Sequence, residues 1–178
     1  SLGDYFYGTW QFLLRIVGYM SPASGRPTQA LKFILAKNQN SNDFQLKRAY
    51  VGSTFEVLAI FSPLMIIPGM LLSWFIPLWL KTPVESIWIV RISCALLVLN
   101  LILVTLLAIP QAIMEGENKS YKRMGLATLL VFIGGSFTWL ALFFNTGIIG
   151  VAVAAIALTI CQLFFYFSIV QKYCQWFG

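Results

Sequence analysis

Four stretches of the chain are each long enough and apolar enough to cross a lipid bilayer as a helix. The hydrocarbon core of a bilayer is about 30 Å thick, so a spanning helix needs about 20 consecutive apolar residues. Segments of this length exceed any membrane-spanning strand, and a helix satisfies all of its backbone hydrogen bonds within itself. The four stretches lie at 57–80, 88–109, 124–144 and 148–170. They predict an all-α integral membrane protein.

The composition argues against a soluble domain. Of the 178 residues, 59% are hydrophobic and only 10% are charged, whereas a soluble domain carries about 25% charged residues. The formal net charge is +6. Because the basic residues fall in short segments between the apolar stretches, they indicate an orientation in a membrane rather than nucleic acid as a partner.

A fifth stretch, residues 5–36, is long enough to span but is interrupted by the sequence SPASGRPTQA at 21–30. Pro22, Gly25 and Pro27 predict a kinked or broken helix at this point. With this stretch included, we expect a five-helix transmembrane bundle. Its spans are predicted at approximately 5–36, 50–80, 86–113, 122–144 and 148–171.

The basic residues of the loops predict the orientation of the bundle. They concentrate in the first and third loops, as Lys32, Lys37, Lys47 and Arg48, and as Lys119, Lys122 and Arg123. By the positive-inside rule we expect residues 37–48 and 115–123 to be cytoplasmic, in a multi-pass protein of the plasma or inner membrane. The chain then starts on the outer side without a visible signal peptide, so we expect an earlier helix to precede it. Glu115 and Glu117 are expected to be solvated loop residues.

The first predicted span carries a polar stripe. Arg15 and Arg26 lie within about 20° of one another around a helix, and Gln11 and Gln29 fall on the same side. An arginine in the membrane costs between about 3 and more than 10 kcal/mol, so it faces a protein interior or a water-filled cavity. These four residues predict a substrate-binding cavity with a positive wall that attracts an anion such as phosphate. In the alternative, both arginines extend to lipid headgroups.

Glu56 lies at the start of the second predicted span. It is either a helix-end charge near Arg48, a partner for Arg26, or a carboxylate that couples transport to an ion. Between the spans, Asn100 and Gln111 are expected to form interhelical hydrogen bonds, since both fall on one helix face. A strip of small residues in the last span predicts close helix packing, and it consists of Gly147, Gly150, Ala154 and Ala157.

The residues needed for enzyme chemistry are missing from the sequence. The chain contains no histidine, which removes histidine acid–base chemistry and Ser-His-Asp triads. The three cysteines, Cys94, Cys161 and Cys174, lack metal-binding spacing, and no phosphate-binding loop for ATP is present. We therefore expect no catalytic residue, no metal site and no cofactor, and we do not expect an enzyme.

Three segments resemble the polysaccharide and oligosaccharidyl-lipid flippases. Residues 2–36 resemble the second helix of that family, "IPQAIMEGENKSYK" is similar to the loop after its fourth helix, and "FFNTGIIGVAVAAIA" is similar to the start of its sixth helix. The matching positions are Leu2, Gly3, Tyr7, Gly8, Gly25, Pro110, Gly116, Lys119, Gly147, Gly150 and Ala152. The resemblance covers nearly the whole chain.

The resemblance implies that the five spans are helices two to six of a transporter with twelve to fourteen helices in two lobes. The first helix and the second lobe of the same chain would then be missing. Such a protein flips an undecaprenyl-pyrophosphate-linked oligosaccharide from the cytoplasm to the periplasm by alternating access, for polysaccharide or O-antigen biosynthesis. Its partners are this lipid-linked substrate and the membrane lipids. Arg26 and Arg15 would meet the pyrophosphate.

Three other classes of protein remain open on the sequence. A multidrug and toxin extrusion-type antiporter needs a buried carboxylate in this lobe, for which Glu56 is the candidate. A membrane scaffold subunit needs only helices that pack, and a deep arginine such as Arg26 argues against it. A membrane glycosyltransferase or acyltransferase is disfavoured because the chain has no histidine and no paired acidic residues.

Overall fold

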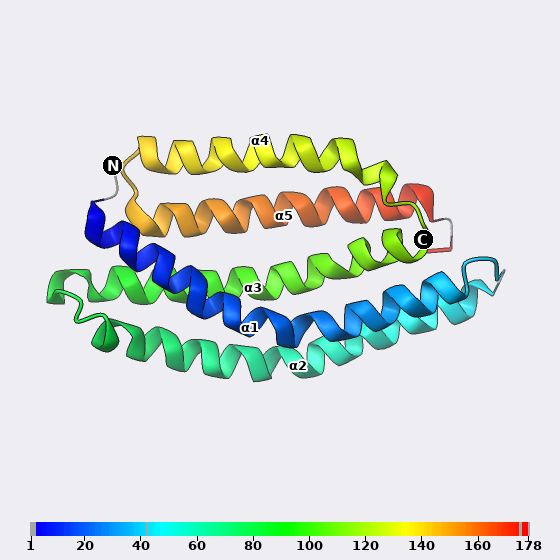
Figure 1. The fold of residues 1–178 in the computed structure, drawn as a ribbon, viewed down its shortest axis with the longest axis horizontal. Helices are drawn as coiled ribbons and strands as arrows, with labels where there is room; N and C mark the ends of the chain where they lie inside the picture. Colours follow the sequence, from blue (N-terminus) through cyan, green and yellow to red (C-terminus); the bar gives the residue numbers. More distant parts are fainter. Residues whose placement is uncertain (1–2, 42, 175, 178) are drawn as a thin grey trace.

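The computed structural model describes the backbone of residues 3–41, 43–174 and 176–177, and the side chains of these residues except those of 21–26 and 123. The described residues form five α-helices and one short 3-10 helix, η1. Their bounds are Asp4–Lys37 for α1, Phe44–Trp79 for α2, Val84–Ser86 for η1, Ile87–Gly116 for α3, Tyr121–Phe143 for α4 and Gly147–Tyr173 for α5. The helices lie side by side along the longest axis, and the two termini lie at opposite ends of the bundle (Figure 1).

Four of these segments are long and apolar enough to cross a membrane, namely α2, η1 with α3, residues Met124–Phe143 of α4, and α5. The chain is therefore a multi-pass membrane protein with an all-α fold, as predicted. Helix α1 is also long enough, with 34 residues, but charged and polar side chains interrupt its apolar sequence. Its crossing of the membrane stays a prediction.

The helices lie where the apolar stretches predicted them, and α2 differs most at its boundary. It begins at Phe44, well before the predicted span at residue 50. The reason is a cap: the side chain of Asp43 accepts a hydrogen bond from the backbone N–H of Leu46 at 2.9 Å. An aspartate in this position satisfies an amide that the first turn of a helix leaves without a partner.

The predicted interruption of the first span is a bend and not a break. Helix α1 continues from Asp4 to Lys37 without leaving the helical conformation, and Figure 1 shows it bending near its middle. A proline inside a helix removes one backbone hydrogen bond while its neighbours keep theirs, which bends the helix. Helix α2 likewise runs through Pro63, Pro68 and Pro77. The predicted kink of α1 is therefore confirmed, and the alternative of a broken helix is wrong (Figure 1).

Helix α3 is the centre of the bundle. It packs against α1, α2 and α5, whereas α4 packs against α5. Close backbone approach holds α3 to its neighbours. A Cβ added to Gly69 would lie 2.5 Å from a methyl carbon of Val98, and one added to Gly116 would lie 2.6 Å from the Cβ of Leu35. Glycine at these positions lets α3 approach α2 and α1 closely.

Candidate functional site

The polar stripe predicted on the first span lies on the exposed face of α1. The side chains of Gln11, Arg15 and Gln29 are all exposed, and Tyr19 between them is 83% exposed. The opposite face of the same helix supplies the core, since Leu13, Val17, Leu31 and Leu35 are buried. This division follows from the helical period, which places residues three and four apart on one face.

The positive charge of Arg15 has no carboxylate partner among the described residues. It forms no ion pair with any residue that the structure describes. Arg15 follows Asp4, the first residue of α1, by eleven positions, which places it about 16 Å along the helix axis at 1.5 Å per residue. The side chain of Arg26 lies outside the described residues, and only its place in the backbone of α1 is known.

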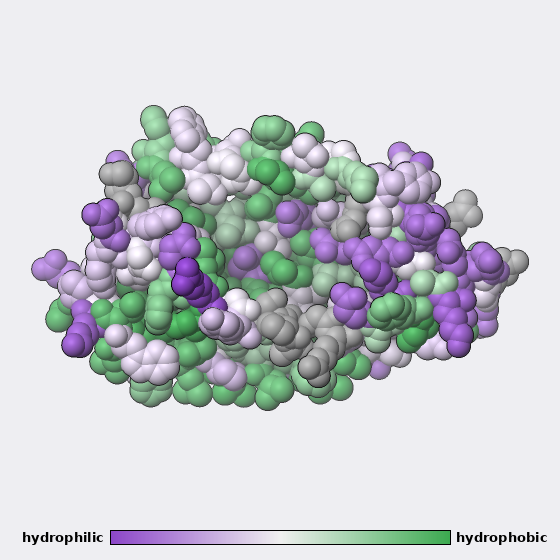
Figure 2. Space-filling model, viewed as in Figure 1, coloured by the Kyte–Doolittle hydropathy of each residue, from purple (hydrophilic) through white to green (hydrophobic). Residues whose placement is uncertain are grey.

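The face of the bundle that carries α1 is hollowed. Figure 2 shows hydrophilic side chains over α1 and a recess between α1 and α4. The helix packing explains this recess: α1 has few contacts with α5, and α4 packs on α5 rather than on α1. The polar face of α1 therefore borders an open recess and is not covered by another helix of the described bundle.

A separate apolar cavity of about 480 Å³ lies where α1, α2 and α3 meet. Glu56 lines it, together with Pro27 of α1, Met65 of α2 and Ile102 of α3. Glu56 is an exposed side chain of α2 and the one charged residue among the residues that line this cavity. Pro27 follows Arg26 directly in the sequence, so the cavity adjoins the bend of α1.

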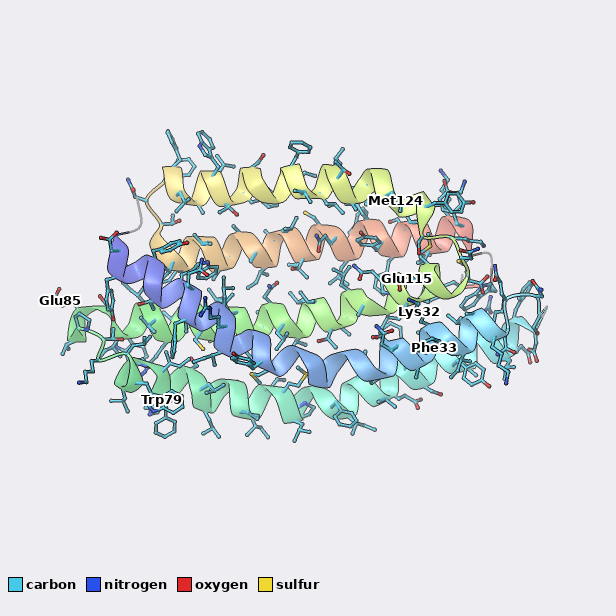
Figure 3. All side chains as sticks on the ribbon, viewed as in Figure 1. Lys32, Phe33, Trp79, Glu85, Glu115 and Met124 are labelled. Carbon is cyan, nitrogen blue, oxygen red and sulfur yellow. The ribbon has the colours of Figure 1, made fainter. Side chains whose placement is uncertain are left out.

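Most of the basic residues gather at one end of the bundle. We call this the basic end; it carries the α1–α2 loop, the α3–α4 loop and the C-terminus (Figure 1), and Figure 2 shows its hydrophilic surface. The Nζ atom of Lys47 lies 2.9 Å from Oε1 of Glu117, with both side chains buried. Lys32 and Glu115 form a second ion pair at 2.9 Å that is more exposed (Figure 3).

These two ion pairs correct the sequence-based view of the acidic residues. Glu115 and Glu117 are not free in solvent: each binds a lysine of another helix, and Glu117 is only 7% exposed. Lys47 also donates to the backbone oxygen of Gln39 at 3.3 Å, and the side chain of Gln39 donates to the backbone oxygen of Glu117 at 3.3 Å. The pairs tie the α1–α2 loop to the end of α3.

At the opposite end of the bundle, Arg91 of α3 lies between two tryptophans. Its guanidinium carbon is 4.1 Å from the ring centre of Trp74 and 5.3 Å from that of Trp88. The backbone oxygen of Arg91 accepts a hydrogen bond from the hydroxyl of Ser73 at 2.8 Å. Cation–π contacts of this kind stabilise a cation near aromatic side chains, so the two indole rings partly compensate this charge.

Two predicted packing features also have their place in the structure. The hydroxyl of Thr159 in α5 donates to the side-chain oxygen of Asn100 in α3 at 2.7 Å, which confirms the interhelical hydrogen bond expected for Asn100. In the small-residue strip of α5, Gly150, Ala154 and Ala157 line a shallow groove against α4. The strip faces α4 but does not fill the space between the two helices.

Comparison with known protein families, with characterised proteins and with solved structures finds no match to this chain.

Proposed function

We propose that the chain is part of the first lobe of a transporter that moves a lipid-linked oligosaccharide across the cytoplasmic membrane. The observation that carries this proposal is the polar face of α1, on which Gln11, Arg15 and Gln29 are exposed instead of packing into the core. Polar and charged side chains cost free energy in a membrane, and in a scaffold whose helices only pack together they would have no function.

The charge of this face favours an anionic passenger. Arg15 has no carboxylate partner among the described residues, so its positive field extends into the recess. A guanidinium binds phosphate through two parallel hydrogen bonds, which suits the pyrophosphate of a lipid carrier. By its position in the sequence Arg26 falls on the same helix sector as Arg15, so we propose that both arginines contact the pyrophosphate.

The predicted orientation of the bundle agrees with transport from the cytoplasm to the outer side of the membrane. The basic end holds most of the lysines, and the positive-inside rule assigns such an end to the cytoplasm. The polar face of α1 then extends from the outer side toward the cytoplasmic headgroups. The remaining wall of the recess would come from the rest of the transporter, which includes an earlier helix and a second lobe.

The test is substitution of the arginines in the intact protein, with surface glycan measured on cells at equal protein level in the membrane. Arg26→Ala is expected to abolish glycan export, whereas Arg26→Lys keeps part of it because the charge remains. Arg15→Ala is expected to reduce export less. Export at the level of the parent protein in Arg26→Ala would remove Arg26 from the site and leave the proposal without its main residue.

The apolar cavity beside Glu56 is the observation for a second candidate function, a multidrug and toxin extrusion-type antiporter, although Glu56 is exposed and not buried as such an antiporter needs. A lipophilic organic cation fits a cavity lined by apolar side chains with a single carboxylate, because the carboxylate supplies the counter-charge. The two functions separate experimentally. Glu56→Gln would abolish cation efflux if the chain belongs to an antiporter, and it would leave glycan export intact if it belongs to a flippase.

A further inference from the structure

The basic end of the bundle contains a polar cavity that the proposed transport function does not use. It has a volume of about 470 Å³, which is within the range of ligand pockets. The α1–α2 loop, the α3–α4 loop and the C-terminal end of α5 all contribute to it. Its charged lining residues are Lys47, Glu117, Lys119 and Lys172.

The charges in this cavity do not balance. Lys47 and Glu117 neutralise one another at 2.9 Å, which leaves Lys119 and Lys172 without an acidic partner among the residues that the structure describes. Asp43, another carboxylate on this side of the bundle, caps α2 and does not line the cavity. The cavity therefore keeps an excess of positive charge.

The two uncompensated lysines have hydrogen-bond donors to spare. Nζ of Lys119 donates to the backbone oxygen of Tyr173 at 2.8 Å. It donates to no other atom of the described residues, which leaves two of its three N–H groups for a ligand. Nζ of Lys172 lies 5.8 Å from the ring centre of Tyr173. Lys122 approaches the same ring to 5.1 Å and adds to the positive field. Three ammonium groups thus surround Tyr173.

Charged groups of this cavity also act on the pKa of a buried thiol next to it, that of Cys174. Burial raises the pKa of Cys174, while the field of Lys119 lowers it, that of Glu117 raises it and that of Lys47 lowers it. All three charged groups are therefore within electrostatic reach of one atom. Lys47 and Lys119 therefore both lie close to this thiol, which follows Tyr173 of the cavity lining.

We propose that this cavity binds a phosphate group, with Lys119 and Lys172 as its ligands and the headgroup of an anionic phospholipid as the expected source. Basic pockets between transmembrane helices hold lipid phosphates at the membrane surface, and this pocket lies at the ends of four membrane helices. Lysine binds phosphate as a point charge without needing one fixed geometry. A soluble phosphate has the same chemistry and is the other source.

The experiment measures binding to the protein purified in a neutral detergent, at constant ionic strength. The probes are short-chain phosphatidylglycerol, short-chain phosphatidylcholine and inorganic phosphate, and the readouts are the unfolding temperature and the dissociation constant. We expect phosphatidylglycerol to bind saturably and to raise the unfolding temperature, and phosphatidylcholine to do neither, since its headgroup carries no net charge.

Two variants and a control locate the site. Lys119→Gln and Lys172→Gln are each expected to weaken phosphatidylglycerol binding about fivefold, which corresponds to one lysine near a membrane surface. Lys172→Gln removes no hydrogen bond among the described residues, so it remains informative if Lys119→Gln unfolds. Lys37→Gln is the control, because Lys37 is exposed at the same end and does not line the cavity.

Binding that depends on Lys119 and Lys172 supports the proposal, and the probe that shows it identifies the source. Dependence seen with phosphatidylglycerol assigns a lipid headgroup, and dependence seen with inorganic phosphate alone assigns a soluble anion. The proposal is overturned if neither probe binds, if both variants bind like the parent protein, or if Lys37→Gln weakens binding as much as they do.

Discussion

Lys47 at the basic end and Arg15 on α1 are both cations in a membrane bundle, yet the chain surrounds them differently. Lys47 is 2% exposed and binds the carboxylate of Glu117, the backbone oxygen of Gln39 and the face of Trp176. Arg15 is exposed and has no ion-pair partner among the described residues. The described residues satisfy the charge of Lys47, and they do not satisfy that of Arg15.

The same contrast separates the acidic residues at the basic end from Arg15 of α1. Glu115 and Glu117 are both used in ion pairs between helices, so the few acids at the basic end serve the fold. None of the described acidic residues pairs with Arg15. A charge that costs several kcal/mol in a membrane and that the fold does not use is the strongest indication of function in this chain.

The substitution with the largest expected effect removes the buried ion pair between Lys47 and Glu117. Glu117→Ala leaves Lys47 as an uncompensated charge, and we expect a loss of about 3–5 kcal/mol in the free energy of unfolding. Glu115→Ala is the matched control, since the Lys32–Glu115 pair is partly exposed and is worth about 0–1 kcal/mol. Unfolding in detergent measures both, and equal losses would contradict the contrast between buried and exposed pairs.

The second prediction compares Gly116, which is tightly packed at the basic end, with Gly125 of α4, which has open space around it. Gly116→Ala places a Cβ 2.6 Å from that of Leu35 and 2.9 Å from the backbone oxygen of Lys32, and such overpacking costs about 1–3 kcal/mol. Gly125→Ala in α4 meets nothing within 4 Å and should stabilise the helix by up to about 1 kcal/mol. Changes of the same sign in the two variants would show that close packing does not distinguish these regions.

A smaller effect concerns the middle of the bundle, where the hydrogen bond between Thr159 and Asn100 joins α5 to α3. Removing the Thr159–Asn100 hydrogen bond is expected to cost about 0.6–2 kcal/mol, as for other hydrogen bonds between membrane helices. The measurement is a double-mutant cycle with Thr159→Val and Asn100→Leu, which isolates the coupling between the two side chains. A coupling energy of zero would mean that the bond contributes nothing to packing.

Much of the fold was predictable because a membrane span imposes one length and one composition. The apolar stretches located α2 to α5, and the helical period of 3.6 residues predicted the exposed side of α1 from Gln11, Arg15 and Gln29 alone. The small-residue strip and Asn100 were likewise assigned to helix contacts from their spacing. These features are local, so the sequence contains them.

The contacts between distant segments were not predictable. Glu117 was expected in solvent because it follows an apolar stretch, whereas its partner Lys47 is far away in the sequence and meets it only when α2 and α3 pack. The cavity beside Glu56 also depends on three helices at once. The early start of α2 was a missed local signal, since Asp43 before Phe44 is a typical helix cap.

The central claim is that the polar face of α1 lines water, and cysteine accessibility tests it most directly. In a cysteine-free background of the intact protein in membranes, Gln11→Cys, Tyr19→Cys and Gln29→Cys are treated with a charged maleimide. Ile60→Cys is the control, because Ile60 is 74% exposed on α2 but is expected to face lipid, where a thiol does not ionise. The account predicts that the three α1 positions are labelled and that Ile60→Cys is not. Failure to label the α1 positions, or labelling of Ile60→Cys at the same rate, would contradict it.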